Sequence, residues 1–132
     1  MADLKPVAAR PMSPHLTIYR LTLTMMMSIV HRITGAALYL GTLLLAWFLI
    51  AASMNSATFA VASGFFHSWF GMLILFGFTW ALMHHLLGGV RHAIWDYGWG
   101  LDAPERDWLA MGTLVGGLGL TLVVWLIYAI WG

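Results

Sequence analysis

The stretch ITGAALYLGTLLLAWFLIAA, residues 33–52, contains no charged residue and is mostly apolar. A helix of about 20 apolar residues is long enough to cross the hydrocarbon core of a bilayer. The whole chain has the same character, because 61% of its 132 residues are hydrophobic and 8% are charged, with a mean hydropathy of +0.85. Soluble domains carry about 25% charged residues. The composition therefore predicts a helical membrane protein.

Outward from this stretch, the chain divides into apolar segments separated by polar connections. Residues 1–20 are polar and contain three prolines, which favour extended or turn structure. The predicted helices cover about residues 21–52, 65–95 and 108–131, with connections at 53–64 and 96–107. We therefore predict an all-α membrane protein, a single domain with three transmembrane helices behind a short N-terminal segment. Three helices enclose little interior, so large partner subunits are expected.

Positive charge gathers on one side of these predicted helices. All Lys and Arg residues lie at the N-terminal end of the first helix or flank the 96–107 connection: Lys5, Arg10, Arg20, Arg32, Arg91 and Arg106. The positive-inside rule then places the N-terminus in the cytoplasm and the C-terminus in the periplasm. Because residues 1–10 do not resemble a transit peptide, a bacterial inner membrane is expected rather than a mitochondrial one.

The sequence HHLLGGVRH, residues 84–92, places three histidines and an arginine in a segment otherwise expected to lie in lipid. Ionisable groups inside a membrane are costly and usually mark a functional site. On a helix they form two neighbouring stripes, with His85, Gly88, Gly89 and His92 on one and His84, Gly88 and Arg91 on the other. Glycines let a flat ligand approach the backbone, and histidine is a common axial ligand of haem iron. The cluster favours a haem site over histidines that only bond to neighbouring helices.

A second polar cluster lies at the start of the first predicted helix. Ser28 and Arg32 are one turn apart, and His31 is adjacent. A hydroxyl and a guanidinium there can bind a quinone carbonyl or the carboxylate of a haem propionate. They can equally be structural, with Arg32 reaching lipid headgroups and Ser28 bonding to its own helix. The residues alone leave both interpretations open.

Other chemistry is excluded or not indicated. Since the chain has no cysteine, it forms no disulfide, thiolate metal site or iron–sulfur cluster of its own. The net charge of +1 and the lack of a basic run do not indicate nucleic-acid binding. No nucleophile–base pair or phosphate loop is found, so a self-sufficient hydrolytic or transfer site is not expected.

Three segments resemble the cytochrome b556 subunit family of succinate dehydrogenase. RPMSPHLTIY at residues 10–19 is similar to the N-terminal signature of that family, and SIVHRITG at 28–35 is similar to its Ser-x-x-His-Arg-x-(Ser/Thr)-Gly segment. HLLGGVRHAIWD at 85–96 is similar to its His-x3-Gly-x-Arg-His-x3-Asp signature. The three motifs occur in order, and with the three-helix length the resemblance covers essentially the whole chain.

This resemblance implies a membrane-anchor subunit of respiratory complex II, the succinate:ubiquinone oxidoreductase of the tricarboxylic acid cycle and aerobic electron transport. The implied partners are a flavoprotein that oxidises succinate, an iron–sulfur subunit and a second anchor subunit, besides membrane lipid. Haem b would lie between the two anchors, and ubiquinone would bind next to the iron–sulfur subunit. The chain alone is not expected to be active.

The resemblance also implies roles for individual residues. His85 would be the axial ligand of haem iron, with the second ligand on the other anchor, although spacing alone does not choose between His84 and His85. Ser28 and Arg32 would contact the quinone, and His31 and Arg32 would lie near the haem propionates. The further surroundings of haem or quinone would be His84, Gly88, Gly89, Arg91 and His92. The extra histidine at position 84 departs from the signature.

Three other functions compete with this interpretation. The chain could anchor a quinol:fumarate reductase, since sequence does not set the direction of the reaction. It could be a structural membrane tether without haem. It could also be a small transporter or proton channel in which the histidines relay protons, a function that needs no soluble partner.

Overall fold

The computed structural model describes residues 18–132. Four α-helices follow one another: α1 (Leu23–Met54), α2 (Ser56–His67), α3 (Trp69–Asp96) and α4 (Glu105–Trp131). Three of them, α1, α3 and α4, are long and apolar enough to cross a membrane. The predicted all-α class with three membrane-crossing helices is thereby confirmed. Lys5 and Arg10 lie outside the described residues. Residues 10–17, most of the first signature segment, also lie outside them.

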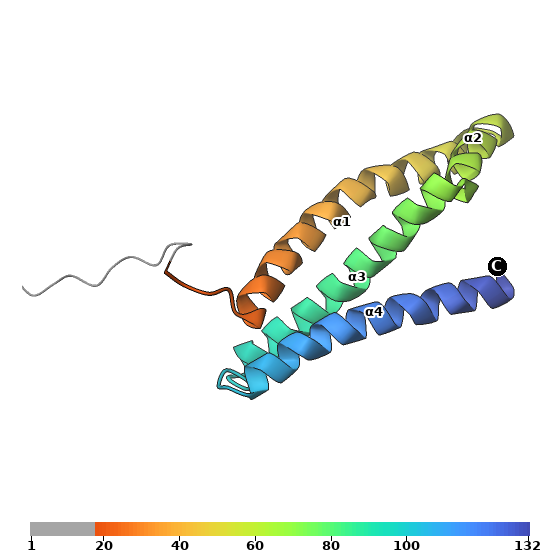
Figure 1. Cartoon of the computed structure of the whole chain (residues 1–132). Coiled ribbons are helices and arrows are strands. Elements are labelled where there is room, and N and C mark those ends of the chain that lie inside the picture. The colour runs from red at the N-terminus through yellow and green to blue at the C-terminus, as the bar shows by residue number, and fades with distance from the viewer. Residues whose placement is uncertain (1–17) are drawn as a thin grey trace, which may run out of the picture.

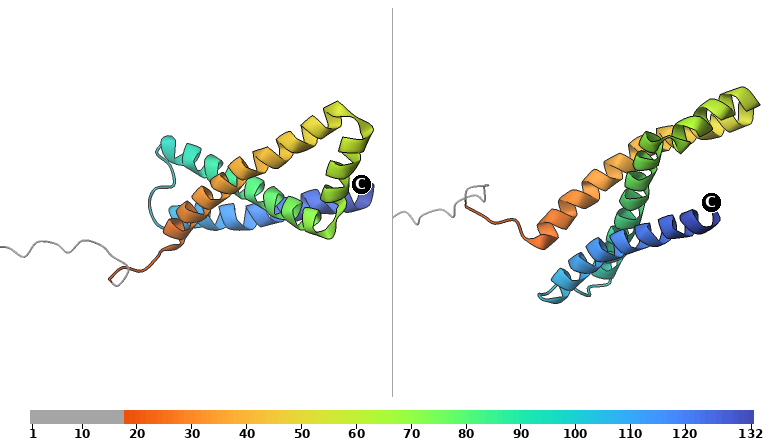
Figure 2. Two further views of the ribbon diagram at one scale, coloured as in Figure 1. Left: turned by 90° about the horizontal axis from the view of Figure 1, so that it is seen from above. Right: turned by 45° about the vertical axis from the view of Figure 1, so that its right-hand side comes forward.

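The long helices form an open bundle. α1 and α3 run past each other in opposite directions, and α4 packs against the C-terminal half of α3 and diverges from it toward the C-terminus (Figure 1; Figure 2). The start of α1, the end of α3 and the start of α4 meet at one end of the molecule, whereas α2 and the C-terminus lie at the other (Figure 1). The two polar clusters predicted on α1 and α3 therefore lie toward the same end.

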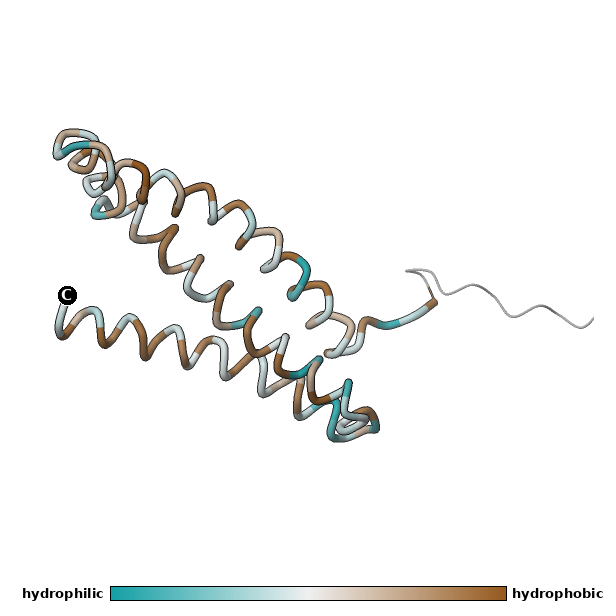
Figure 3. The backbone as a smooth tube through the Cα atoms, turned by 180° about the vertical axis from the view of Figure 1, so that it is seen from behind, coloured by the Kyte–Doolittle hydropathy of each residue, from teal (hydrophilic) through white to brown (hydrophobic). Residues whose placement is uncertain are grey.

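Charge is confined to that end as well. Figure 3 shows hydrophilic residues concentrated around the connection between α3 and α4 and the nearby turns of α1 and α3. The Arg, Asp and Glu residues of the described chain are Arg20, Arg32, Arg91, Asp96, Asp102, Glu105, Arg106 and Asp107. The opposite end carries none, so the two ends of the bundle differ sharply in charge.

The segment predicted as a connection at 53–64 is helical, and the second long helix begins later than expected. Asn55 and Ser68 both adopt extended backbone geometry and bound the short helix α2. The Asn55 side chain accepts a hydrogen bond from the backbone N–H of Thr58 at 2.9 Å, and Ser68 Oγ accepts one from Gly71 N–H at 3.1 Å. Each side chain caps a helix N-terminus, so the predicted helix 65–95 is split at Ser68.

The start of α4 also differs from the expected residue 108. The helix begins at Glu105, and Glu105 and Asp107 both lie in its first turn. Negative side chains there are stabilised by the partial positive charge of the helix N-terminus. The acidic residues assigned to the connection thus extend the helix by about one turn.

The helices meet through small side chains. The buried hydrophobic residues are Met27 and four alanines, Ala51, Ala62, Ala81 and Ala110. Gly117 lies against the backbone of His84, because a Cβ on this glycine would be 3.0 Å from His84 Cα. Small residues allow such close approach of membrane helices. Most large apolar side chains point outward, toward whatever surrounds the bundle.

Candidate functional site

Three of the histidines form one cluster between α1 and α3. The imidazole rings of His31 and His85 are stacked, with centroids 3.9 Å apart and planes 5° from parallel. The ring of His92 is tilted against His31, with centroids 5.3 Å apart. Since His31 comes from α1 and the other two from α3, the structure joins the two clusters that the sequence placed on separate helices.

Hydrogen bonds fix the orientation of the His85 ring. Its Nδ1 lies 3.1 Å from the backbone carbonyl oxygen of His31 and 3.3 Å from Thr34 Oγ1. A carbonyl oxygen can only accept, so Nδ1 carries the proton and donates it. In the neutral ring the other nitrogen, Nε2, then carries a lone pair, and no residue within 18–132 forms a hydrogen bond with it. Metal-binding histidines commonly show this arrangement, with one nitrogen bonded to a carbonyl and the other free for the metal.

His84 points elsewhere, although it is the next residue. Its side chain is fully buried, with 0% exposure, between α3 and Gly117 of α4, and its ring lies 5.4 Å from that of Trp80. Neither ring nitrogen has a partner among the described residues. A bulky ligand could reach His84 only by separating α3 from α4, whereas His85 is half-buried on the side of α1.

The two stripes predicted on α3 have different surroundings. His84, Gly88 and Arg91 are all buried; Arg91 is 2% exposed, and its guanidinium carbon lies 5.1 Å from the centre of the Trp95 ring. On the other stripe, Gly89 and His92 are exposed. The open stripe, not the buried one, is the face on which a planar ligand can lie.

The two glycines between the histidines also differ. A Cβ on Gly88 would overlap the imidazole of His31, so the space beside this glycine is filled by α1. A Cβ on Gly89 would have no neighbour within 4 Å. Gly88 thus allows α1 to approach α3, and only Gly89 leaves its backbone open on the side of His85.

The polar cluster of α1 lies beside the histidines. Ser28 is half-buried and Arg32 is exposed. Within residues 18–132, neither side chain takes part in a hydrogen bond or an ion pair. Their polar groups are therefore available to a ligand or to another chain at the charged end of the bundle.

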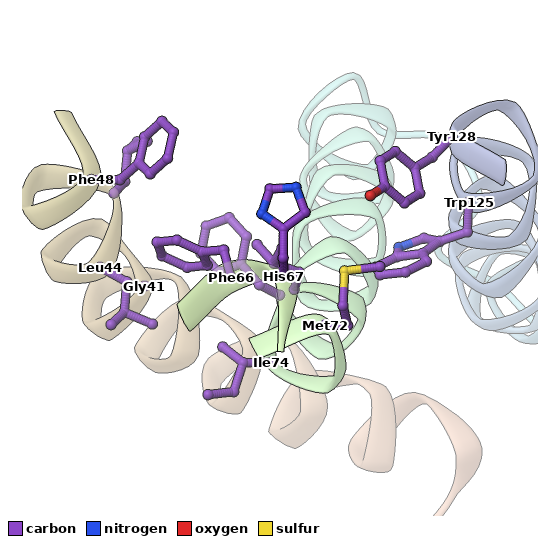
Figure 4. A pocket seen from close by; sticks show the side chains of 12 residues that line it. Gly41, Leu44, Phe48, Phe66, His67, Met72, Ile74, Trp125 and Tyr128 are labelled. Atoms are coloured by element: carbon purple, nitrogen blue, oxygen red, sulfur yellow. The ribbon is translucent and has the colours of Figure 1, made fainter. Parts of the chain in front are cut away.

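A large cavity lies away from this site, toward the uncharged end. It has a volume of about 360 Å³, and Figure 4 shows Phe48, Phe66, Trp125 and Tyr128 around it. The other lining residues are also mostly apolar: Gly41, Leu44, Leu45, His67, Met72, Ile74, Leu75 and Phe78. The cavity contains none of the predicted site residues. In residues 18–132, no three His, Asp or Glu side chains are placed to hold a free metal ion.

Three residues near the cluster were given no role by sequence reasoning. Thr34 is 1% exposed and hydrogen bonds with the His31 carbonyl. Gly35 makes room for the His85 ring, since a Cβ there would lie 3.0 Å from His85 Cε1. Gly117 makes room for His84. Two of them have a signal in the sequence: Thr34 and Gly35 follow His31 by about one helical turn and are the (Ser/Thr)-Gly positions of the second motif.

The sequence profile of the succinate dehydrogenase/fumarate reductase transmembrane subunit family matches residues 7–130. The chain belongs to this family. The succinate dehydrogenase cytochrome b556 subunit of Paracoccus denitrificans is 41% identical over 131 residues, 97% of this chain and 100% of the relative. The subunit of the same name from Rickettsia prowazekii is 34% identical over 116 residues, 88% of this chain and 90% of the relative.

A mitochondrial member of the family is also similar. The succinate dehydrogenase cytochrome b560 subunit of Sus scrofa is 43% identical over 98 residues, 73% of this chain and 58% of the relative. The resemblance inferred from the three motifs is confirmed, and these relatives are subunits of an oxidoreductase complex. Membership and the three apolar helices together support a multi-pass membrane anchor of the inner membrane.

Proposed function

We propose that this chain is the cytochrome b anchor subunit of a succinate:ubiquinone oxidoreductase. One observation carries the proposal: Nδ1 of His85 donates to the His31 carbonyl, which leaves Nε2 without a hydrogen-bond partner among the described residues, on a helix whose nearby Gly89 is open to a ligand. The cytochrome b names of the relatives support the presence of a haem.

The residues present fit haem b. His85 Nε2 would supply one lone pair to the iron, and the exposed residues of the same stripe of α3, Gly89 and His92, would leave room for the macrocycle. His31, Arg32 and His92 lie toward the charged end, where they suit the negative propionate carboxylates. When bound, haem b supplies a one-electron carrier within the membrane. Because Gly89 and His92 are exposed in the single chain, a second histidine ligand and the facing wall would come from the second anchor subunit.

Ser28 and Arg32 suit a quinone carbonyl. A hydroxyl and a guanidinium one helical turn apart both donate hydrogen bonds, and a charged donor forms the stronger of the two. They lie at the end of the bundle that bears all the charge of the described residues. We place this end at the cytoplasmic face of a bacterial inner membrane, where the iron–sulfur subunit and the flavoprotein bind and deliver electrons from succinate.

Purification of the complex through a tag on this chain tests the proposal. We expect the flavoprotein and the iron–sulfur subunit to co-purify, and dithionite reduction to produce the α-band of a b-type haem. Co-purification without an α-band would favour the structural tether. A chain that purifies without soluble subunits would favour the transporter. Redox titration of the haem, together with the quinone type of the membrane, distinguishes succinate oxidation from fumarate reduction.

A further inference from the structure

The hydrogen bonds around His85 involve a residue to which neither the motifs nor the relatives give a role. Thr34 lies one turn after His31 on α1, and its side chain is 1% exposed. Its hydroxyl donates to the backbone carbonyl of His31 at 2.9 Å. The hydroxyl oxygen, Thr34 Oγ1, also lies 3.3 Å from His85 Nδ1. The hydroxyl therefore contacts both partners of the bond that orients the imidazole.

Only a proton on His85 Nδ1 satisfies these three atoms together. The His31 carbonyl accepts from the Thr34 hydroxyl and from His85 Nδ1–H, because a carbonyl oxygen has two lone pairs. The hydroxyl hydrogen is committed to the carbonyl, so Thr34 Oγ1 faces Nδ1–H with a lone pair and acts as a second acceptor. A proton on Nε2 instead would set the lone pair of Nδ1 against the carbonyl oxygen.

We infer that Thr34 is a positioning residue for His85, acting through Nδ1 to fix its tautomer and to raise the basicity of Nε2. The inference rests on the proposed function, in which Nε2 binds haem iron. When the ring nitrogen that does not bind the metal donates a hydrogen bond, the histidine becomes a stronger electron-pair donor to the metal. A stronger donor favours the ferric over the ferrous state of the iron. Loss of the Thr34 acceptor therefore raises the midpoint potential of the haem.

The fold supplies a matched control on the same helix. Thr42 also donates to a carbonyl three residues earlier, that of Tyr39, at 2.6 Å. Thr42 is exposed and makes no hydrogen bond to a histidine. Replacing Thr42 with Val removes the same kind of hydroxyl from α1 without touching the cluster. A difference in haem properties between Thr34→Val and Thr42→Val is then due to the contact of Thr34 with His85.

The test compares complexes purified with Thr34→Val, Thr34→Ala, Thr34→Ser and Thr42→Val. The readouts are haem content, midpoint potential by redox titration, and the electron paramagnetic resonance spectrum of the oxidised haem. We expect a higher potential and an altered spectrum in Thr34→Val, with wild-type behaviour in Thr34→Ser and Thr42→Val. Thr34→Ala also removes the hydroxyl but adds no bulk, so it provides the same test if the valine variant does not assemble.

Two outcomes overturn the inference. Wild-type potential and spectrum in the assembled variants without the hydroxyl would show that Thr34 does not act on His85, and an equal shift in Thr34→Ser would show that the hydroxyl is not the cause. His85→Ala, prepared in parallel, separates this failure from failure of the proposed function. If His85→Ala keeps the haem with an unchanged spectrum, the ligand assignment itself is wrong.

Discussion

Arg32 is the most accessible charged side chain of the proposed quinone site. It is exposed on α1 and forms no ion pair within the described part of the chain. We predict that Arg32→Ala lowers succinate:ubiquinone reductase activity at least about tenfold, because a hydrogen bond from a charged donor contributes about 1.5–3 kcal/mol and about 1.4 kcal/mol corresponds to a factor of ten. Ubiquinone reduction by membranes that contain the variant measures this loss.

Dye-coupled succinate oxidation is the internal control, because it does not require the quinone site. It should stay near the wild-type rate in Arg32→Ala. Arg20→Ala serves as a matched variant, since Arg20 is also exposed but precedes α1. Full quinone reductase activity in Arg32→Ala would contradict the assigned role.

His84 and His85 illustrate what the sequence could and could not predict about single residues. Residue spacing correctly placed two polar stripes on α3, but it could not distinguish His84 from His85 as ligand. The distinction depends on which helix covers which stripe: α4 buries His84 through Gly117, and α1 contacts His85 through His31. Such contacts between distant residues cannot be read from local spacing.

At the scale of elements, small residues set the distance between α3 and α4. A Cβ on Gly117 would lie 3.0 Å from His84 Cα and 3.2 Å from its Cβ, so a larger side chain must push the helices apart. We predict that Gly117→Val lowers the thermal stability of the complex, since overpacking costs about 1–3 kcal/mol. Loss of haem absorbance or of assembled complex on heating provides the measurement.

Gly112→Val is the control on the same helix. A Cβ on Gly112 would have no neighbour within 4 Å, so the added side chain should be tolerated in an apolar environment. Equal stability losses in the two variants would show that the effect arises from valine in α4 and not from the contact with His84.

The long apolar segments were predictable, whereas the short helix α2 between α1 and α3 was expected to be part of a connection and part of the second long helix. Hydropathy locates α1, α3 and α4 because lipid requires long apolar helices. Helix α2 is equally apolar, so its boundaries depend on two single residues, Asn55 and Ser68, whose side chains cap the following helices. Asn and Ser are common N-caps, but composition alone does not reveal which of them end a helix.

At the scale of the whole molecule, the separation of charge predicts the orientation in the membrane. Because the chain has no cysteine, single cysteines can be introduced at exposed positions at the two ends. Ala57→Cys, in α2, should react with an impermeant maleimide added outside intact cells. Ala103→Cys, before α4, should react only after the membrane is permeabilised. The reverse pattern would contradict the proposed cytoplasmic charged end.

The single chain provides only part of the proposed haem site. Gly89 and His92 of the stripe with His85 are exposed, and in the proposed site a second wall comes from another subunit. The sequence predicted this division of the site only through family resemblance. The structure adds a physical argument, because the His85 ring is half-buried against His31 of α1 and does not lie in the tightly packed interface with α4.

The most direct test of this account is the haem content of complexes carrying His85→Ala or His84→Ala. Both substitutions remove an imidazole from the same turn of α3, but only His85 has one nitrogen bonded to a carbonyl and the other free. We predict that His85→Ala loses most of the b-type haem per assembled complex, whereas His84→Ala retains nearly the wild-type amount. Equal haem content in the two variants, or greater loss in His84→Ala, would contradict the assignment of His85 as the haem ligand.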